Sequence, residues 1–212
     1  MNKTLDIIAK ALSILLYPLF VPTYGMALFC YAYHTQVTPL TTVWWIVAIV
    51  GTFVLTCALP LSAIYWLIRR GEVADMQIAN AQERTVPYIY AAMGFCFWAY
   101  LVTAILHAPL FLDIIATGAT IAIVCVLFVN RWWKISAHLT GLGGLFGGLL
   151  TYCVGIGGIP TWWTLGLWTG LSLLLMYARL RLNAHTAAQV MAGWLLGIFW
   201  TAIPYCIYSY VA

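Results

Sequence analysis

Three short polar clusters hold most of the side chains in this sequence that suit chemistry. Their chemically active members are, in order, Gln77 and Arg84, then Lys134, Ser136 and His138, then Arg179, His185 and Gln189. Histidine titrates near pH ~6.5, so it accepts and releases protons under physiological conditions. Arginine stays charged and binds the oxygens of an anion through paired hydrogen bonds. If the fold brings the clusters together, they can form one pocket for an anion.

The clusters interrupt a sequence that is otherwise strongly apolar. Of the 212 residues, 65% are hydrophobic and only 7% are charged, whereas a soluble domain carries about 25% charged residues. Three long stretches, residues 11–68, 135–178 and 182–212, contain no charged side chain. Because a membrane-spanning helix needs about 20 apolar residues, the composition excludes a water-soluble globule and predicts an integral-membrane protein.

The apolar stretches divide into seven segments that can each form a helix. We predict these helices at residues 11–33, 43–68, 88–106, 109–129, 138–156, 161–177 and 185–208. The predicted fold class is all-α: a polytopic transmembrane helical bundle with six or seven spans, in a single domain over residues 1–212. The first segment contains Pro18 and Pro22. Besides a full span, it therefore allows a surface helix followed by a short span, or a re-entrant segment.

Glycines at four-residue spacing predict how the helices pack. Such pairs let two helix backbones approach closely in a bilayer, where lipid supplies no hydrophobic driving force. The pairs are Gly143 with Gly147, Gly144 with Gly148, and Gly193 with Gly197. We interpret them as packing faces within the chain, with a dimer interface as the alternative.

The basic residues predict the orientation of the chain in its membrane. With seven spans, all of them fall on the side of the N-terminus: Lys3, Lys10, Arg69, Arg70, Arg84, Arg131, Lys134, Arg179 and Arg181. Positively charged loops face the cytoplasm, so we expect the three clusters on the cytoplasmic side of what we take to be a bacterial inner membrane. A single arginine or histidine at a membrane surface is more often an interfacial anchor, but three clusters on one side can converge.

In order and spacing, the clusters resemble the motifs of the type-2 phosphatidic acid phosphatase superfamily, which are integral-membrane lipid phosphatases. The family pattern is Lys-x6-Arg-Pro, then Pro-Ser-Gly-His, then Ser-Arg-x5-His-x3-Asp. The matching positions are Gln77 and Arg84 with a displaced Pro87, then Ile135-Ser136-Ala137-His138, then Ala178-Arg179, His185 and Gln189. The resemblance covers about residues 75–195 and implies the helical core of that family.

The resemblance implies a metal-independent phosphatase that acts on a lipid phosphate monoester or pyrophosphate through a phosphohistidine. His185 would attack phosphorus, His138 would protonate the departing oxygen and then activate water, and Gln189 would orient His185. The phosphoryl oxygens would be bound by five further side chains: Arg84, Ser136, Arg179, Gln77 and Lys134. Expected partners are membrane lipids, without nucleic acid. We expect no cofactor or metal, because too few carboxylates converge for a two-metal site.

Two substitutions within the motifs leave the activity open. Gln189 stands where the family has aspartate, so a hydrogen bond to His185 can survive on a shared helix face, but the negative charge is lost. In serine proteases the analogous loss of charge costs about 10⁴ in turnover. Gln77 replaces the lysine of the family and removes a phosphate contact. The alternatives are therefore a catalytically impaired binder or transporter of anionic lipid, or a lipid phosphotransferase.

Overall fold

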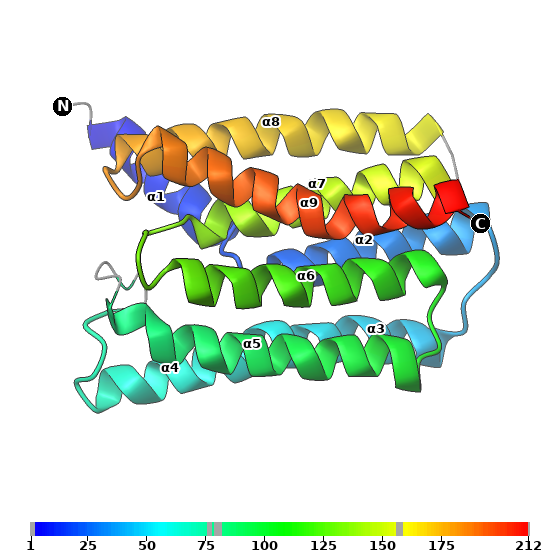
Figure 1. Cartoon of the computed structure of the whole chain (residues 1–212), viewed down its shortest axis with the longest axis horizontal. Helices are drawn as coiled ribbons and strands as arrows, with labels where there is room; N and C mark the ends of the chain where they lie inside the picture. Colours follow the sequence, from blue (N-terminus) through cyan, green and yellow to red (C-terminus); the bar gives the residue numbers. More distant parts are fainter. Residues whose placement is uncertain (1–2, 76–77, 79–81, 156–158, 212) are drawn as a thin grey trace.

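The computed structural model describes residues 3–75, 78, 82–155 and 159–211, and these residues form helices and their connections (Figure 1). The α-helices are α1 (Lys3–Leu15), α2 (Val21–Gln36), α3 (Thr42–Phe53), α4 (Leu59–Arg69), α5 (Thr85–Tyr100), α6 (Leu110–Val129), α7 (Ala137–Gly155), α8 (Ile159–Arg181) and α9 (Ala187–Val211). A π-helical segment, Val54–Ala58, joins α3 to α4, and a second one, Leu101–Ile105, extends α5. The all-α prediction is confirmed for this part of the chain.

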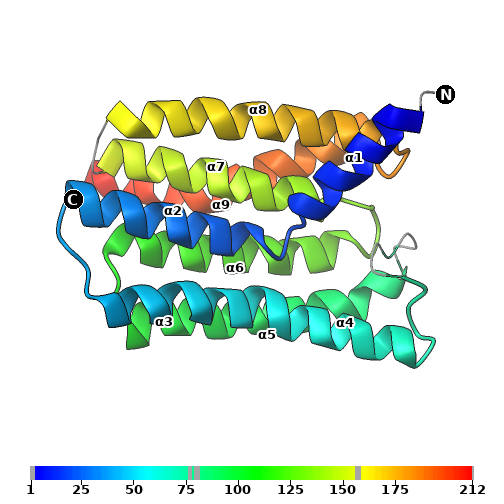
Figure 2. The ribbon, with the colours of Figure 1, turned by 180° about the vertical axis from the view of Figure 1, so that it is seen from behind.

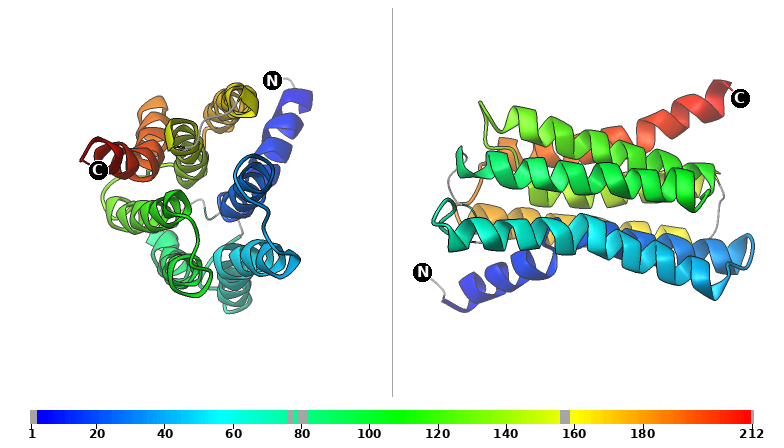
Figure 3. Two further views of the ribbon diagram at one scale, coloured as in Figure 1. Left: turned by 90° about the vertical axis from the view of Figure 1, so that its right-hand side faces the viewer. Right: turned by 90° about the horizontal axis from the view of Figure 1, so that it is seen from below.

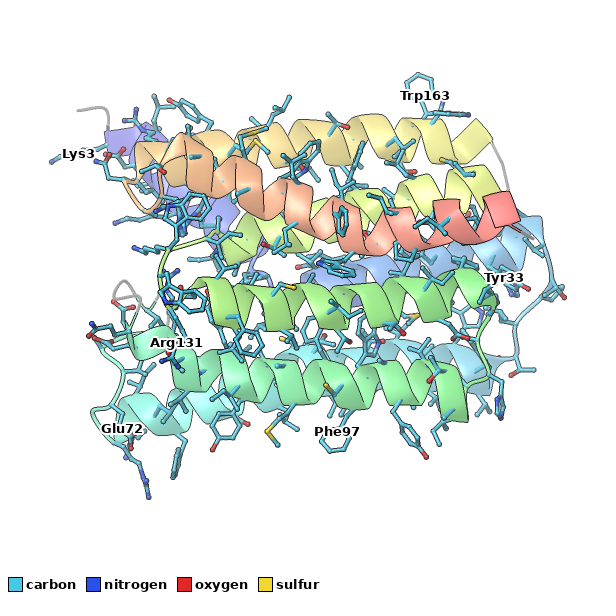
Figure 4. All side chains as sticks on the ribbon, in the orientation of Figure 1. Lys3, Tyr33, Glu72, Phe97, Arg131 and Trp163 are labelled. Atoms are coloured by element: carbon cyan, nitrogen blue, oxygen red, sulfur yellow. The ribbon has the colours of Figure 1, made fainter. Side chains whose placement is uncertain are left out.

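Several of the helices are those of a membrane protein. Among the described residues, five are long and apolar enough to cross a bilayer: Thr42–Arg69, Gln82–Ile105, Leu110–Val129, Ala137–Gly155 and Ala187–Tyr205. Large apolar side chains such as Val43 and Phe97 point outward from them, as Figure 4 shows for Phe97. A soluble monomer rarely exposes apolar surface on this scale, so the outer face of the bundle is suited to lipid.

The first predicted helix, residues 11–33, is wrong as a single element. The chain forms α1, leaves helical geometry after Leu15 and starts α2 at Val21, and α1 lies at an angle to the other helices (Figure 2). Pro22 falls in the first turn of α2, where its missing N–H costs no hydrogen bond. The 13 residues of α1 are too few to cross a bilayer, so the first segment is a short helix followed by a second one.

The remaining predicted boundaries agree to within a few residues, with one consequence for the site. The α8 helix continues to Arg181 instead of ending near residue 177, so Arg179 lies in its last turn and not in a loop. The α9 helix begins at Ala187, so His185 lies in the turn before it. Asn183 in that turn has a φ of 49°, a left-handed conformation that asparagine adopts readily.

Two of the three glycine pairs, Gly143 with Gly147 and Gly193 with Gly197, pack helices of the same chain against each other, as predicted. The α7 and α9 helices lie side by side. A Cβ atom added to Gly143 would strike the backbone of Trp194, and one added to Gly197 would strike the backbone of Thr140. These glycines let α7 and α9 approach until their backbones touch. Gly144 does not share that tight contact, because a Cβ atom added there would have only a side-chain carbon of Thr201 within 4 Å.

The bundle brings the three polar clusters to one end. Viewed along its axis, α7, α8 and α9 lie on one side, α3, α4 and α5 on the other, and α2 and α6 between them (Figure 3). The connections α4–α5, α6–α7 and α8–α9 all lie at the end where α1 starts (Figure 1). Lys3, Glu72 and Arg131 lie at this end, whereas Tyr33 lies toward the other (Figure 4). Residues far apart in sequence therefore share one region.

Candidate functional site

One cavity is lined by side chains from each of the three clusters. It has a volume of about 140 Å³, and Arg84, His138, Arg179 and His185 line it. Arg84 ends the 3₁₀ turn before α5, and His138 lies in the first turn of α7. Arg179 comes from the last turn of α8 and His185 from the turn before α9. Four helix ends thus place these side chains around a common space.

The ring of His185 is held through one nitrogen by two acceptors. Its Nδ1 atom lies 3.1 Å from the carbonyl oxygen of Lys134 and 3.3 Å from Oε1 of Gln189. The backbone N–H of Thr186 donates to that same Oε1 atom at 3.1 Å, which identifies it as the oxygen of the amide. Because both neighbours of Nδ1 can only accept, Nδ1 carries the proton. The Nε2 atom keeps its lone pair, as a nucleophile requires.

Gln189 is fixed in place by a second role, at the start of α9. Its backbone N–H donates to Oγ1 of Thr186 at 3.4 Å, while its Oε1 accepts from the backbone N–H of Thr186. This reciprocal pair is a capping box. His185 precedes the helix, so the two residues do not share a helix face as we expected. The capping box turns the glutamine oxygen back toward the histidine, and the orienting hydrogen bond is present without a charge.

Burial and nearby positive charge keep His185 neutral. Burial, followed by the charges of Arg179 and Arg84, lowers the pKa of His185 to about 4. The residue is only 7% exposed. At neutral pH the unprotonated form therefore dominates, which again suits attack on an electrophile.

Arg84 and Arg179 are buried cations that lack a carboxylate partner. They are 6% and 5% exposed, and neither forms an ion pair within the described part of the chain. Nε of Arg84 donates to the carbonyl of Ile78 at 2.7 Å, whereas Nε of Arg179 is buried without a hydrogen-bond partner. A buried charge that lacks a counterion costs several kcal/mol. Two of them lining one cavity can together attract an anion with more than one negative charge.

Elsewhere at this end of the bundle, two basic side chains have acidic partners. The ion pairs are Arg181 with Asp6 at 2.8 Å and Arg70 with Glu72 at 3.7 Å. Arg181 is only two residues from Arg179, yet it points to α1, as expected from a rotation of about 200° between them on a helix. Arg181, unlike its neighbour Arg179, therefore has a counterion outside the cavity.

His138 is held through the opposite ring nitrogen from His185. Its Nε2 atom lies 3.1 Å from the carbonyl oxygen of Ser13 at the end of α1, and the ring of Tyr17 packs edge-on against it at 5.5 Å. Since a carbonyl can only accept, Nε2 of His138 carries the proton and Nδ1 has the lone pair. The end of α1 therefore covers Nε2 of His138.

Two of the predicted phosphate contacts, Ser136 and Lys134, do not line the cavity. Ser136 is completely buried and its Oγ atom has no partner, while its backbone N–H donates to the carbonyl of Gln189 at 3.3 Å. Lys134 contributes its carbonyl to His185. Burial, then the charges of Arg84 and Arg179, lower the pKa of its side chain. Ser136 and Lys134 thus support the site through backbone atoms, and Gln77 lies outside the described residues.

Two tyrosines that sequence analysis missed line the cavity. Tyr88 is in contact with the side chain of Arg84, and Tyr17 packs against His138. Tyr88 follows Arg84 by four residues, a spacing that places both on one side of a helix. This spacing could have predicted Tyr88 as a neighbour of Arg84. Tyr17 lies in the break between α1 and α2, and nothing in the local sequence connects it with His138.

Within the described residues, no group of three or more His, Cys, Asp or Glu side chains is placed to hold a metal ion. The chain matches no protein-family model, no curated protein and no solved structure.

Proposed function

We propose that this protein is an integral-membrane phosphatase of the type-2 phosphatidic acid phosphatase superfamily. Its substrate would be a lipid phosphate monoester or pyrophosphate. One observation carries the proposal: Arg84 and Arg179 are buried, form no ion pair within the described residues, and line the same cavity as His185, whose Nδ1 faces two acceptors and whose Nε2 keeps its lone pair. A phosphoryl group supplies the negative charge that the arginines lack and the electrophile that His185 can attack.

The reaction would proceed in two steps. Nε2 of His185 forms a bond to phosphorus while the bond from phosphorus to the leaving oxygen breaks, and the two guanidinium groups hold the phosphoryl oxygens. His138, protonated beside the bound phosphate, gives a proton to the leaving oxygen. Water then attacks phosphorus, the P–N bond breaks, and His138 takes a proton from that water. His185 returns to its neutral form, and phosphate leaves.

The contact of His138 with Ser13 constrains this scheme. The proton on Nε2 faces a carbonyl of α1 instead of the cavity. Donation from Nε2 therefore requires that the end of α1 moves or that the ring turns, whereas donation from Nδ1 of the protonated ring leaves the contact with Ser13 intact.

A second candidate function is binding or transport of an anionic lipid without turnover. It is favoured by the neutral Gln189 beside His185 and by the covered Nε2 atom of His138. Capture of the phosphohistidine by an alcohol instead of water would make the protein a lipid phosphotransferase. The three candidates share the arginine site and differ in what happens to phosphorus.

For the membrane arrangement we propose seven spans formed by α2, the continuous α3–α4 and α5 helices, and α6 to α9. The end of the bundle that holds the basic residues would then face the cytoplasm. A reporter enzyme fused after Ala212 tests this orientation, because seven spans in this orientation put the C-terminus on the opposite, extracytoplasmic side. A cytoplasmic reporter would rule it out.

Phosphate release by the purified protein tests the proposed activity. The panel contains phosphatidate, phosphatidylglycerol phosphate, a polyprenyl pyrophosphate and a lipid A phosphate, with His185→Ala as the inactive variant. His107→Asn is the matched control, because His107 is exposed near the other end and asparagine tolerates its φ of 45°. We expect release by the wild type and by the control, and none by His185→Ala. Equal release by all three proteins overturns the catalytic assignment.

A further inference from the structure

The cavity extends beyond Arg84, His138, Arg179 and His185. On α6 its lining runs from Val126 to Leu112, which is about 21 Å along the helix at 1.5 Å per residue. Val126 lies toward the α6–α7 connection, at the end with the polar clusters, and Leu112 lies near the opposite end of α6. Since the hydrocarbon core of a bilayer is about 30 Å thick, the cavity reaches across most of its depth inside the bundle.

The deep part of the cavity has an apolar wall. Met26, Phe29, Phe95, Ile115 and Leu145 contribute large side chains. Small residues leave the space between them: Gly25, Ala91, Ala119, Ala122, Gly141 and Gly144. Protein interiors normally pack to the density of organic crystals and leave few voids larger than a water molecule. An apolar space of this length is suited to an occupant that is itself apolar.

The threonine and tryptophan side chains in the cavity wall already have hydrogen-bond partners. Trp98 donates its Nε1–H to Oγ1 of Thr52 at 2.8 Å. Thr140 and Thr201 donate their hydroxyl groups to the backbone carbonyls of Ser136 and Gly197, at 3.0 and 2.9 Å. A cavity of about 140 Å³ has space for on the order of ten waters, but each would need two to four polar partners. With these groups already satisfied, water gains little there.

We propose that the cavity binds one hydrocarbon tail of the lipid whose phosphate lies at Arg84 and Arg179. The inference rests on the proposed phosphate site, and it narrows the substrate to a lipid phosphate with a single chain in the bundle. Spread over the length of the cavity, its volume accommodates one chain and not two side by side. Specificity for chain length follows, because carbons beyond the depth of the cavity find no wall to contact.

Narrowing the cavity tests the inference by kinetics. Gly144→Leu directs a side chain into the cavity, and its Cβ atom would meet only Cγ2 of Thr201, at 3.7 Å. Gly166→Leu is the matched control, because a Cβ atom added to Gly166 on α8 would have nothing within 4 Å. The substrates are butyl phosphate and hexadecyl phosphate. We expect Gly144→Leu to lower kcat/KM at least about tenfold for the long substrate only, and Gly166→Leu to change neither. An equal loss on both substrates, or no loss, overturns the inference.

A cross-linking experiment separates this inference from the proposed reaction. The probe is an alkyl phosphonate that ends in a photoreactive diazirine, bound to the wild-type protein and mapped by mass spectrometry. We expect labels near Phe29, Leu112 and Ile115, which line the deep end. Labels confined to outward-facing residues such as Val43 or Phe97 overturn the tail site. Deep labelling without phosphate release supports the tail site and removes the phosphatase proposal.

Discussion

The Nδ1 atom of His185 lies 3.3 Å from Oε1 of Gln189, and the same oxygen accepts a hydrogen bond from the backbone N–H of Thr186. The second bond fixes which end of the amide faces the ring, and so it also fixes the position of the histidine proton. An aspartate would provide orientation and charge together. Gln189 provides orientation alone, so the ring is positioned for attack but its developing positive charge is left without a counterion.

Replacing Gln189 separates its two roles. Gln189→Ala removes both the capping box and the hydrogen bond to His185, so we expect a loss of stability of about 1 kcal/mol and a fall in kcat of roughly 10–100-fold, as for other orienting partners. Thr186→Ala keeps the backbone N–H that fixes Oε1 and removes only the hydroxyl. It should show a similar loss of stability with kcat changed less than about twofold. Equal losses of kcat in the two variants would mean that helix capping alone explains Gln189.

The protonation state of His185 is open to direct measurement. Because its folded pKa is about 4 and that of an unfolded chain is about 6.5, the unfolded state binds more protons between these values. The stabilising contribution of neutral His185 is therefore present above about pH 6.5 and is lost as the pH falls toward 4. Nitrogen-15 NMR of labelled histidine, assigned with His185→Asn, should show a neutral ring with the proton on Nδ1 at about pH 6. A charged ring at that pH would be incompatible with the site as described.

The two buried arginines should not tolerate lysine. Arg84→Lys and Arg179→Lys keep the charge but lose the planar pair of donors that matches a phosphoryl group. A hydrogen bond to a charged group is worth about 1.5–3 kcal/mol, so kcat/KM should fall by about 10–150-fold in each variant. Arg70→Lys is the control, because Arg70 is exposed and stacks on Trp66 away from the cavity. Lysine variants as active as the wild type would remove phosphate binding from these residues.

The contact between α7 and α9 predicts a contrast between two glycine substitutions. Gly143→Ala drives a Cβ atom into the backbone of Trp194, so we expect destabilisation by about 1–3 kcal/mol. Gly166→Ala enters open space on α8 and should be neutral or stabilising by up to about 1 kcal/mol, because alanine is the better helix former. Thermal unfolding in detergent measures both. If the two variants melt at the same temperature, the close approach of α7 and α9 is not what these glycines permit.

The sequence was most informative where a feature is local or periodic. Apolar length placed the helix at 43–68 almost to the residue, and motif spacing selected Arg84, His138, Arg179 and His185, which the fold brings to one cavity. Alternation of helix direction explains why this worked, since connections two, four and six must lie at one end of a bundle.

The features that were missed depend on contacts between distant segments or on competing local signals. Ser13 and His138 are separated by 125 residues, and no local pattern reports such a pairing. Pro18 and Pro22 allowed a full span, a surface helix followed by a short span, or a re-entrant segment, so they did not by themselves predict the break before α2. The spacing Thr186-x-x-Gln189 is typical of a capping box. Gln189 also aligns with the aspartate of the family motif, and the motif alone was considered.

Trapping the covalent intermediate decides whether His185 is a nucleophile. The protein is mixed with a lipid phosphate that carries radioactive phosphorus, quenched within one turnover, and digested for peptide mapping. We expect label on His185 that is stable in base and labile in acid. It should be absent from His185→Ala. Phosphate release without any labelled histidine would contradict the phosphohistidine mechanism, as would lipid binding with neither label nor release.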